Sequence, residues 1–169
     1  MAALGLAARG GSAAPVIQSG GGIAGGGSLL TDTESPAEFS VFGSQFAVEG
    51  SDEPIFFGSL SYLDVTGNMT VESSTITAYG PLEGAETTTR QMTGMATVNG
   101  AGIYPFNLTL VDGGAIGTGA DAFQLAIGND GETDVTDPSY LVQSDVQSGN
   151  LQLLTFDFES VDASATPAG

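Results

Sequence analysis

Several residue types that carry most enzyme chemistry are missing from this chain. The sequence contains no cysteine, no histidine, no lysine and no tryptophan. Without histidine and cysteine, the Ser-His-Asp and Cys-His arrangements and the usual zinc ligands are excluded. A lysine nucleophile is excluded too. Pairs of carboxylates remain possible, but none stands in a context that predicts a raised pKa, so we expect that the protein is not an enzyme.

Positive charge is almost absent. Twenty Asp and Glu residues face two basic residues, Arg9 and Arg90, which gives a formal net charge of −18. Such a chain repels nucleic-acid phosphates, so we expect no nucleic-acid partner. Long apolar runs are absent as well. No segment approaches the roughly 20 apolar residues that a membrane-spanning helix needs, so we expect no membrane span.

The first 30 residues differ in composition from the rest. Residues 1–14, an apolar run followed by small residues, are typical of the end of a signal peptide, with a flexible start of the chain as the alternative. The first interpretation predicts a secreted, extracellular or cell-surface protein. Residues 15–30 are a glycine-rich arm with two interpretations. The arm is either a linker or ordinary first strand, or an extended segment that adds to a sheet edge of its own or a neighbouring subunit. In the second case its contact residues would be Val16, Ile17, Ile23, Leu29 and Leu30.

Residues 31–160 alternate apolar and polar side chains in short runs separated by turn residues, which is typical of β-strands. The expected strands are residues 38–48, 55–63, 69–79, 90–98, 103–111, 123–127, 140–146 and 151–158. This spacing predicts an all-β fold, an antiparallel β-sandwich of the immunoglobulin-like or jelly-roll-like kind with about eight or nine strands. Residues 161–169 are expected to form a flexible tail.

Residues 92–127 carry the clearest local signals. Asn99-Gly100 predicts a two-residue hairpin, since both positions tolerate positive φ. Gly43, inside an earlier strand, predicts a β-bulge, and Pro105 predicts an edge position or an irregularity in its strand.

The same stretch resembles a β-domain module of secreted bacterial and archaeal proteins. That module has a TxNG hairpin, a YxF strand, a VxDG turn and a GxGxDxFxI strand in succession. The matching positions are Thr97, Asn99, Gly100, Tyr104, Phe106, Val111, Asp112, Gly113, Gly117, Gly119, Asp121, Phe123 and Ile127. Such modules often carry arginine after the phenylalanine, where this chain has Gln124. The resemblance implies a small extracellular β-sandwich and brings no catalytic residues with it.

Few polar groups suggest a site. Arg90 is expected to pair with a carboxylate across strands or near the loop at residues 80–89, with ligand binding as the alternative. The acidic turn at residues 128–138 offers oxygen ligands for Ca²⁺, although its spacing is not that of an EF-hand and a solvated turn explains it equally. Those ligands would be Asn129, Asp130, Glu132, Asp134 and Asp137. Asn68 and Asn107 stand in N-glycosylation sequons.

Two functions fit these observations. The first is a secreted structural subunit of an extracellular filament or surface layer, a homopolymer formed when the arm of one subunit completes the sheet of the next by donor-strand complementation. The second is a secreted binding or adhesion module that contacts a carbohydrate or a surface, with a structural Ca²⁺ as its candidate cofactor. The absence of tryptophan weakens the second function, since sugar-binding modules use aromatic rings for stacking.

Overall fold

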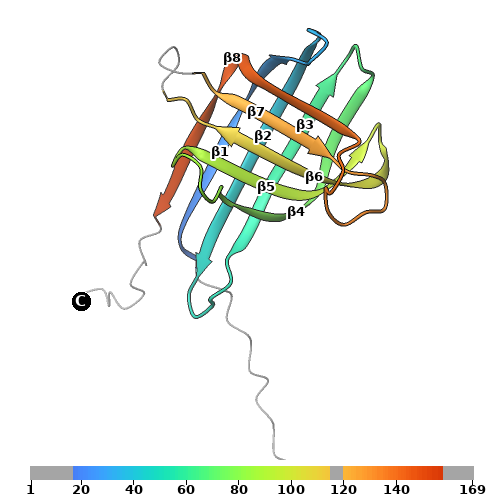
Figure 1. The fold of residues 1–169 in the computed structure, drawn as a ribbon. Helices are drawn as coiled ribbons and strands as arrows, with labels where there is room; N and C mark the ends of the chain where they lie inside the picture. Colours follow the sequence, from blue (N-terminus) through green and yellow to red (C-terminus); the bar gives the residue numbers. More distant parts are fainter. Residues whose placement is uncertain (1–16, 115–119, 158–169) are drawn as a thin grey trace, which may run out of the picture.

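Eight antiparallel strands close into one barrel in the computed structural model, which describes residues 17–114 and 120–157 (Figure 1). Each strand pairs with the next one along the chain, and β8 pairs back with β1. The strands are β1 (Ile17–Leu30), β2 (Pro36–Val48), β3 (Ile55–Asp64), β4 (Met69–Pro81), β5 (Thr89–Val98), β6 (Ala101–Val111), β7 (Ala122–Ile127) and β8 (Tyr140–Asp157).

The predicted β-sandwich is therefore wrong, although the all-β class is confirmed. A sandwich and a barrel require the same alternation of inward and outward side chains, so the pattern along single strands did not separate them. The deciding element is β8. Its first residues pair with β7, from Tyr140 opposite Ile127 to Asp145 opposite Ala122. Its remainder pairs with β1, from Val146 opposite Leu29 to Asp157 opposite Ser19. One continuous strand thus replaces the two strands predicted for residues 140–158.

The strong local signal at Asn99-Gly100 is confirmed. The two residues have φ values of 52° and 73° and connect β5 to β6. The Asn99 side chain also accepts a hydrogen bond from the Thr70 amide at 2.9 Å and donates one to the Asn68 carbonyl at 3.1 Å. The hairpin is thereby fixed to the turn between β3 and β4.

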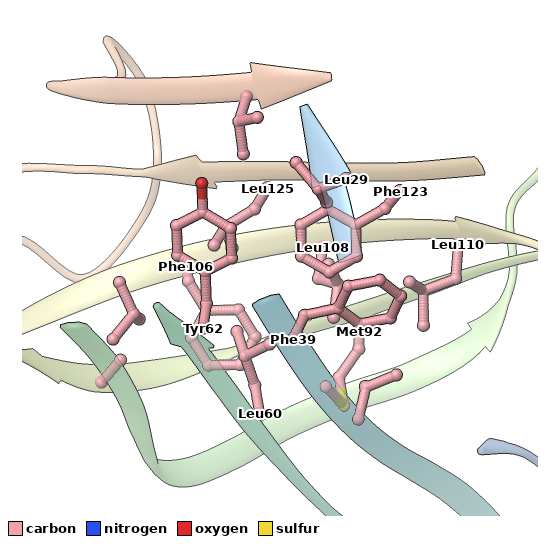
Figure 2. Packing of buried hydrophobic residues seen from close by; sticks show 14 of the residues in the cluster. Leu29, Phe39, Leu60, Tyr62, Met92, Phe106, Leu108, Leu110, Phe123 and Leu125 are labelled. Atoms are coloured by element: carbon pink, nitrogen blue, oxygen red, sulfur yellow. The ribbon is translucent and has the colours of Figure 1, made fainter. Parts of the chain in front are cut away.

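The barrel interior is filled by side chains rather than by solvent through most of its length. Figure 2 shows the central part, where Phe39, Tyr62, Phe106 and Phe123 pack among leucines. The ring of Phe123 lies 4.5 Å from that of Phe39 and 5.9 Å from that of Tyr62, measured between centroids. An eight-stranded barrel is just wide enough for such a packed core.

Two irregularities that we expected within strands take another form. Gly43 keeps regular pairing with Ile23 and Gly58, so the predicted bulge is wrong. The glycine instead makes room for an aromatic ring, because a Cβ there would lie 2.7 Å from a ring carbon of Tyr79. Pro105 is buried and lies just beyond the end of the β6–β7 ladder, where its carbonyl accepts a hydrogen bond from Gly128. It does not mark an open sheet edge.

Two aspartates close the seam that the short β7 leaves beside β8. The Asp121 carboxylate accepts hydrogen bonds from the amides of Leu151 at 2.5 Å and Gly113 at 2.8 Å. The Asp112 carboxylate accepts one from the Leu153 amide at 2.8 Å. Backbone donors of β8 that no strand satisfies are thus satisfied by carboxylates. Both aspartates of the VDG and GxGxDxF motifs have a structural role in this chain.

Within residues 17–114 and 120–157, no helix is long and apolar enough to cross a membrane.

Candidate functional site

One end of the barrel opens into a pocket of about 420 Å³. It lies at the end where β1 begins and β8 finishes, a proximity that follows from the pairing of Ser19 with Asp157 (Figure 1). Five strands, β1, β2, β4, β5 and β8, contribute its lining, which consists of Ser19, Gly20, Gly21, Gln45, Ala47, Tyr79, Gly80, Pro81, Arg90, Thr155 and Asp157. We call this pocket the barrel mouth.

Small residues keep the mouth open. The inward row that carries Ile23 and Leu29 in the filled part of β1 continues into the mouth as Gly21 and Ser19. On β2, the row of Phe39 and Val41 continues to Gln45 and Ala47. A Cβ added at Gly21 would meet only the Leu154 carbonyl oxygen, at an ordinary contact distance of 3.6 Å. The core therefore stops before the barrel ends.

Tyr79 lies beneath this opening with an unsatisfied polar atom. Its side chain is 5% exposed, and its hydroxyl is buried without a hydrogen-bond partner among the described residues. Burial raises the pKa of Tyr79 to about 12, and the charge and hydrogen-bonding capacity of the nearby Arg90 guanidinium group oppose part of this rise. Arg90 is thus close to the hydroxyl, although the two form no hydrogen bond of normal geometry. Leaving a buried hydroxyl unpaired costs about 1–3 kcal/mol. Native structures tolerate such groups rarely, and often at functional sites.

Arg90 is the cation of the mouth. It stands opposite Pro81 in the β4–β5 ladder, and the neighbouring inward pair is Met92 with Tyr79. Its Nη1 atom donates to the carbonyl oxygens of Thr87 at 2.7 Å and Thr89 at 2.9 Å. Within the described part of the chain it forms no ion pair, which departs from the carboxylate partner expected from the sequence. Two backbone carbonyls thus hold the guanidinium group in place.

The other polar groups of the mouth come from three strands. They are the Gln45 amide of β2, the Ser19 hydroxyl of β1 and the Thr155 hydroxyl of β8, with the Asp157 carboxylate at the exposed end of β8. A Cβ added at Gly80 would lie 3.4 Å from the Gln45 side-chain oxygen, so the amide reaches across the pocket toward β4. Hydrogen-bond donors and acceptors therefore converge at the mouth.

We call the opposite end of the barrel, where buried side chains continue to Tyr62 and Asp64, the closed end. The hydroxyls of Tyr62 and Tyr140 lie 2.6 Å apart, and the Asp64 carboxylate accepts a hydrogen bond from the Gly67 amide at 2.7 Å. Burial raises the pKa of Tyr62, with contributions from the hydrogen bond to Tyr140 and the charge of Asp64. Burial also raises the pKa of Tyr140. In contrast to the mouth, the hydroxyls here have partners.

The residues predicted for subunit contacts are part of the chain's own barrel. Ile23 and Leu29 are buried in the core, whereas Leu30 is 41% exposed. Ile17 pairs with Val48 at the start of β1, and Val16 lies outside the described residues. The arm is thus the first strand of its own sheet, one of the alternatives left open by the sequence.

Aromatic rings cover the outer face of this strand. The ring of Phe46, on β2, lies 5.4 Å from that of Phe156, on β8, and 5.9 Å from that of Phe57, on β3. A Cβ added at Gly20 or Gly22 would press against the Phe46 or Phe156 ring. The absence of side chains at Gly20 and Gly22 therefore leaves room for the aromatic rings of β2 and β8 on the outer face of β1.

The acidic turn after β7 satisfies several of its carboxylates by itself. Asp130 accepts a hydrogen bond from the Ile103 amide at 2.8 Å, and Glu132 accepts bonds from the Asn129 amide and side chain at 3.2 Å each. Asp134 accepts a hydrogen bond from the Thr133 hydroxyl. In residues 17–114 and 120–157, no three acidic side chains gather in the manner of a metal site. The predicted Ca²⁺ ligands Asn129, Asp130, Glu132, Asp134 and Asp137 gain no support from this arrangement.

The two sequons lie in different settings. Asn68 is exposed in the turn between β3 and β4, with a φ of 49°. Asn107 is half-buried on β6, and its side-chain oxygen accepts a hydrogen bond from Gln91 at 2.9 Å. Geometry thus favours Asn68 as the more accessible of the two.

Searches against protein-family models, curated proteins and solved structures find no match to this chain. The resemblance to secreted β-domain modules therefore stays a prediction, and the functional argument rests on the chain's own geometry.

Sequence reasoning missed the mouth because its parts stand far apart along the chain. The alternation of side chains in residues 89–98 can be recognised from the sequence, and it places Arg90 on the same face of the strand as Met92. The barrel must close before the lining residues come together, and no local sequence pattern predicts that closure. These residues are Tyr79, Arg90, Gln45, Ser19 and Thr155.

Proposed function

We propose that this protein is a non-enzymatic binding module whose barrel mouth takes up a small polar molecule. The observation that carries the proposal is a pocket of about 420 Å³ in which the buried Tyr79 hydroxyl has no hydrogen-bond partner, and Arg90 no ion pair, among the described residues. Pockets of this size accommodate small ligands, and a few convergent polar groups give such sites their specificity. The composition, with neither histidine nor cysteine, supports binding rather than catalysis.

The setting that we propose is extracellular. The support comes from the signal-like residues 1–14, which lie outside the described residues, and from the acidic composition. A net charge of −18 keeps copies of the protein apart and favours a soluble module at a cell surface or in the medium.

A direct test of binding is to titrate a panel of neutral, anionic and cationic small molecules into ¹⁵N-labelled protein and follow the amide resonances. We expect the responding amides to cluster around Gly21, Gly80 and Arg90. In the Gly21→Leu variant, whose side chain would occupy the mouth, the response should disappear. A panel without any response at the mouth, or with responses at the closed end only, would contradict the proposal.

The filament subunit is a second candidate. This candidate is supported by the small contribution that β1 makes to the core. Among its described side chains, the large buried ones are those of Ile23 and Leu29. Because β1 pairs with β2 and β8 of its own chain, donation would take the form of a strand exchange between copies. Sedimentation of the purified protein distinguishes the two candidates, since a binding module stays monomeric and an exchanging subunit polymerises with concentration.

A further inference from the structure

The ligand class follows from the charges and donors of the mouth, if the mouth binds a small molecule as proposed above. Arg90 is the only cationic side chain among the described residues of a chain with a net charge of −18. Its Nη1 atom is held by the Thr87 and Thr89 carbonyls. Among the described residues its Nε and Nη2 atoms form no hydrogen bond of normal geometry, although the Tyr79 hydroxyl lies near the guanidinium group. A guanidinium group in a fixed orientation is suited to bidentate binding of a carboxylate.

The groups opposite Arg90 define the rest of the ligand. Gln45, Ser19 and Thr155 bring an amide and two hydroxyl groups to the pocket walls, which can exchange hydrogen bonds with the hydroxyls of a ligand. Gly21 and Ala47 leave the space for its body. A volume of about 420 Å³ leaves room for a small ligand that contains a sugar ring.

The surrounding negative charge limits the ligand to one carboxylate. Asp157 lies on the pocket wall, and its carboxylate would repel a second anionic group near β8. The net charge of the whole chain opposes polyanions further. A hydroxylated ligand with a single carboxylate therefore fits the charges of the mouth better than a dicarboxylate or an acidic polymer does.

We infer that the barrel mouth recognises a small hydroxylated monocarboxylate, such as a single uronic acid, and that Arg90 binds its carboxylate. Tyr79 is part of the pocket lining, and its buried hydroxyl lies near Arg90, so it supports the site by reaching the ligand or the guanidinium group after a small side-chain movement. A bound acid group would give this buried donor a hydrogen-bond partner.

The probe for this inference is D-glucuronate, and its neutral isostere D-glucuronamide is the matched control. Both are titrated into the full-length ¹⁵N-labelled protein while the amides of Gly21, Gly80 and Arg90 are followed. We expect glucuronate to bind at least about tenfold more tightly than glucuronamide, as loss of a charge-assisted hydrogen bond implies. A trimer of galacturonate, which represents the end of an acidic polysaccharide, should bind more weakly than the single uronate.

Variants separate the carboxylate contact from the pocket itself. Arg90→Gln should lower glucuronate affinity at least about tenfold and abolish its advantage over glucuronamide. Arg90→Lys, which keeps the charge but loses the planar fork, should give an intermediate loss. Tyr62→Phe at the closed end serves as the control and should leave both affinities unchanged. The amide spectra of the same samples establish that each variant is folded.

The outcomes for the ligand class and for the proposed function differ. If glucuronamide binds at the mouth as tightly as glucuronate and Arg90→Gln changes neither, the carboxylate inference is overturned while the binding function stands. Tighter binding of the galacturonate trimer than of the single uronate overturns the restriction to one acid group. If no compound of either charge perturbs the mouth, both the inference and the binding function are rejected.

Discussion

The two ends of this barrel use the same residue type in opposite ways. At the closed end, the Tyr62 and Tyr140 hydroxyls share a 2.6 Å hydrogen bond, and the core continues up to them. At the mouth, the buried Tyr79 carries a hydroxyl that has no hydrogen-bond partner among the described residues, at an open pocket. This difference underlies our proposal that the first end serves stability and the second end serves binding.

The substitution with the largest expected effect on stability tests whether β1 is part of the barrel wall. In Gly25→Ala the added methyl would overlap the Asn150 carbonyl oxygen of β8, because the two backbones approach closely there. We expect a loss of about 3 kcal/mol or more in the free energy of unfolding. The measurement is urea unfolding followed by circular dichroism.

Gly21→Ala is the matched control, since it places the same methyl on the same strand in the open mouth. Its nearest neighbour would lie 3.6 Å away, so the stability should change by less than about 0.5 kcal/mol. Equal tolerance of both substitutions would mean that β1 does not pair within its own chain in solution.

A second expectation concerns the carboxylate seam beside β8. Asp121→Asn removes the charge that two backbone amides, those of Gly113 and Leu151, share. We expect a loss of about 2–3 kcal/mol, since hydrogen bonds to charged groups are the stronger kind. Thermal unfolding at neutral pH measures it, with the exposed Asp137→Asn as a control that should behave as wild type. If Asp121→Asn leaves the thermal stability unchanged, the seam does not stabilise the barrel.

The sequence predicted the local parts of this fold but not its closure. The Asn99-Gly100 hairpin and strands β2 to β7 follow from turn residues and alternation within a few positions of one another. The pairing of β1 with β8 joins residues at opposite ends of the chain, and nothing in either segment specifies the other. The sequence predicted two strands separated at residues 147–150, yet β8 continues through them, with a φ of 106° at Gly149.

The site shows the same division. The inward direction of Arg90 follows from its spacing to Met92, a local property. Its neighbours in the mouth are set by the stagger of five strands. The expectation of a carboxylate partner rested only on Arg90 being the single cation in an acidic chain. Long-range pairing, rather than residue chemistry, was the missing information.

Alkaline pH sharpens the comparison of the buried tyrosines. Their pKa values are raised in the folded protein, to about 12 for Tyr79, above the ordinary value near 10. Above pH 10 the unfolded chain loses these protons while the folded chain keeps them, so stability falls with rising pH. The slope should be about 1.4 kcal/mol per pH unit for each such tyrosine. Urea unfolding at pH 9, 10 and 11 measures this slope, and a flat profile would contradict the burial of these hydroxyls.

The most direct test of the difference between the two ends is one small substitution made at both. Tyr62→Phe removes a hydroxyl that pairs with Tyr140 and should destabilise the protein by about 1 kcal/mol. Tyr79→Phe removes a hydroxyl that has no partner among the described residues and should leave stability unchanged or raise it by about 1 kcal/mol. Urea unfolding of both variants at pH 7 is the measurement. We predict that Tyr62→Phe lowers the free energy of unfolding, whereas Tyr79→Phe leaves it unchanged or raises it. Equal destabilisation by both substitutions would contradict this account.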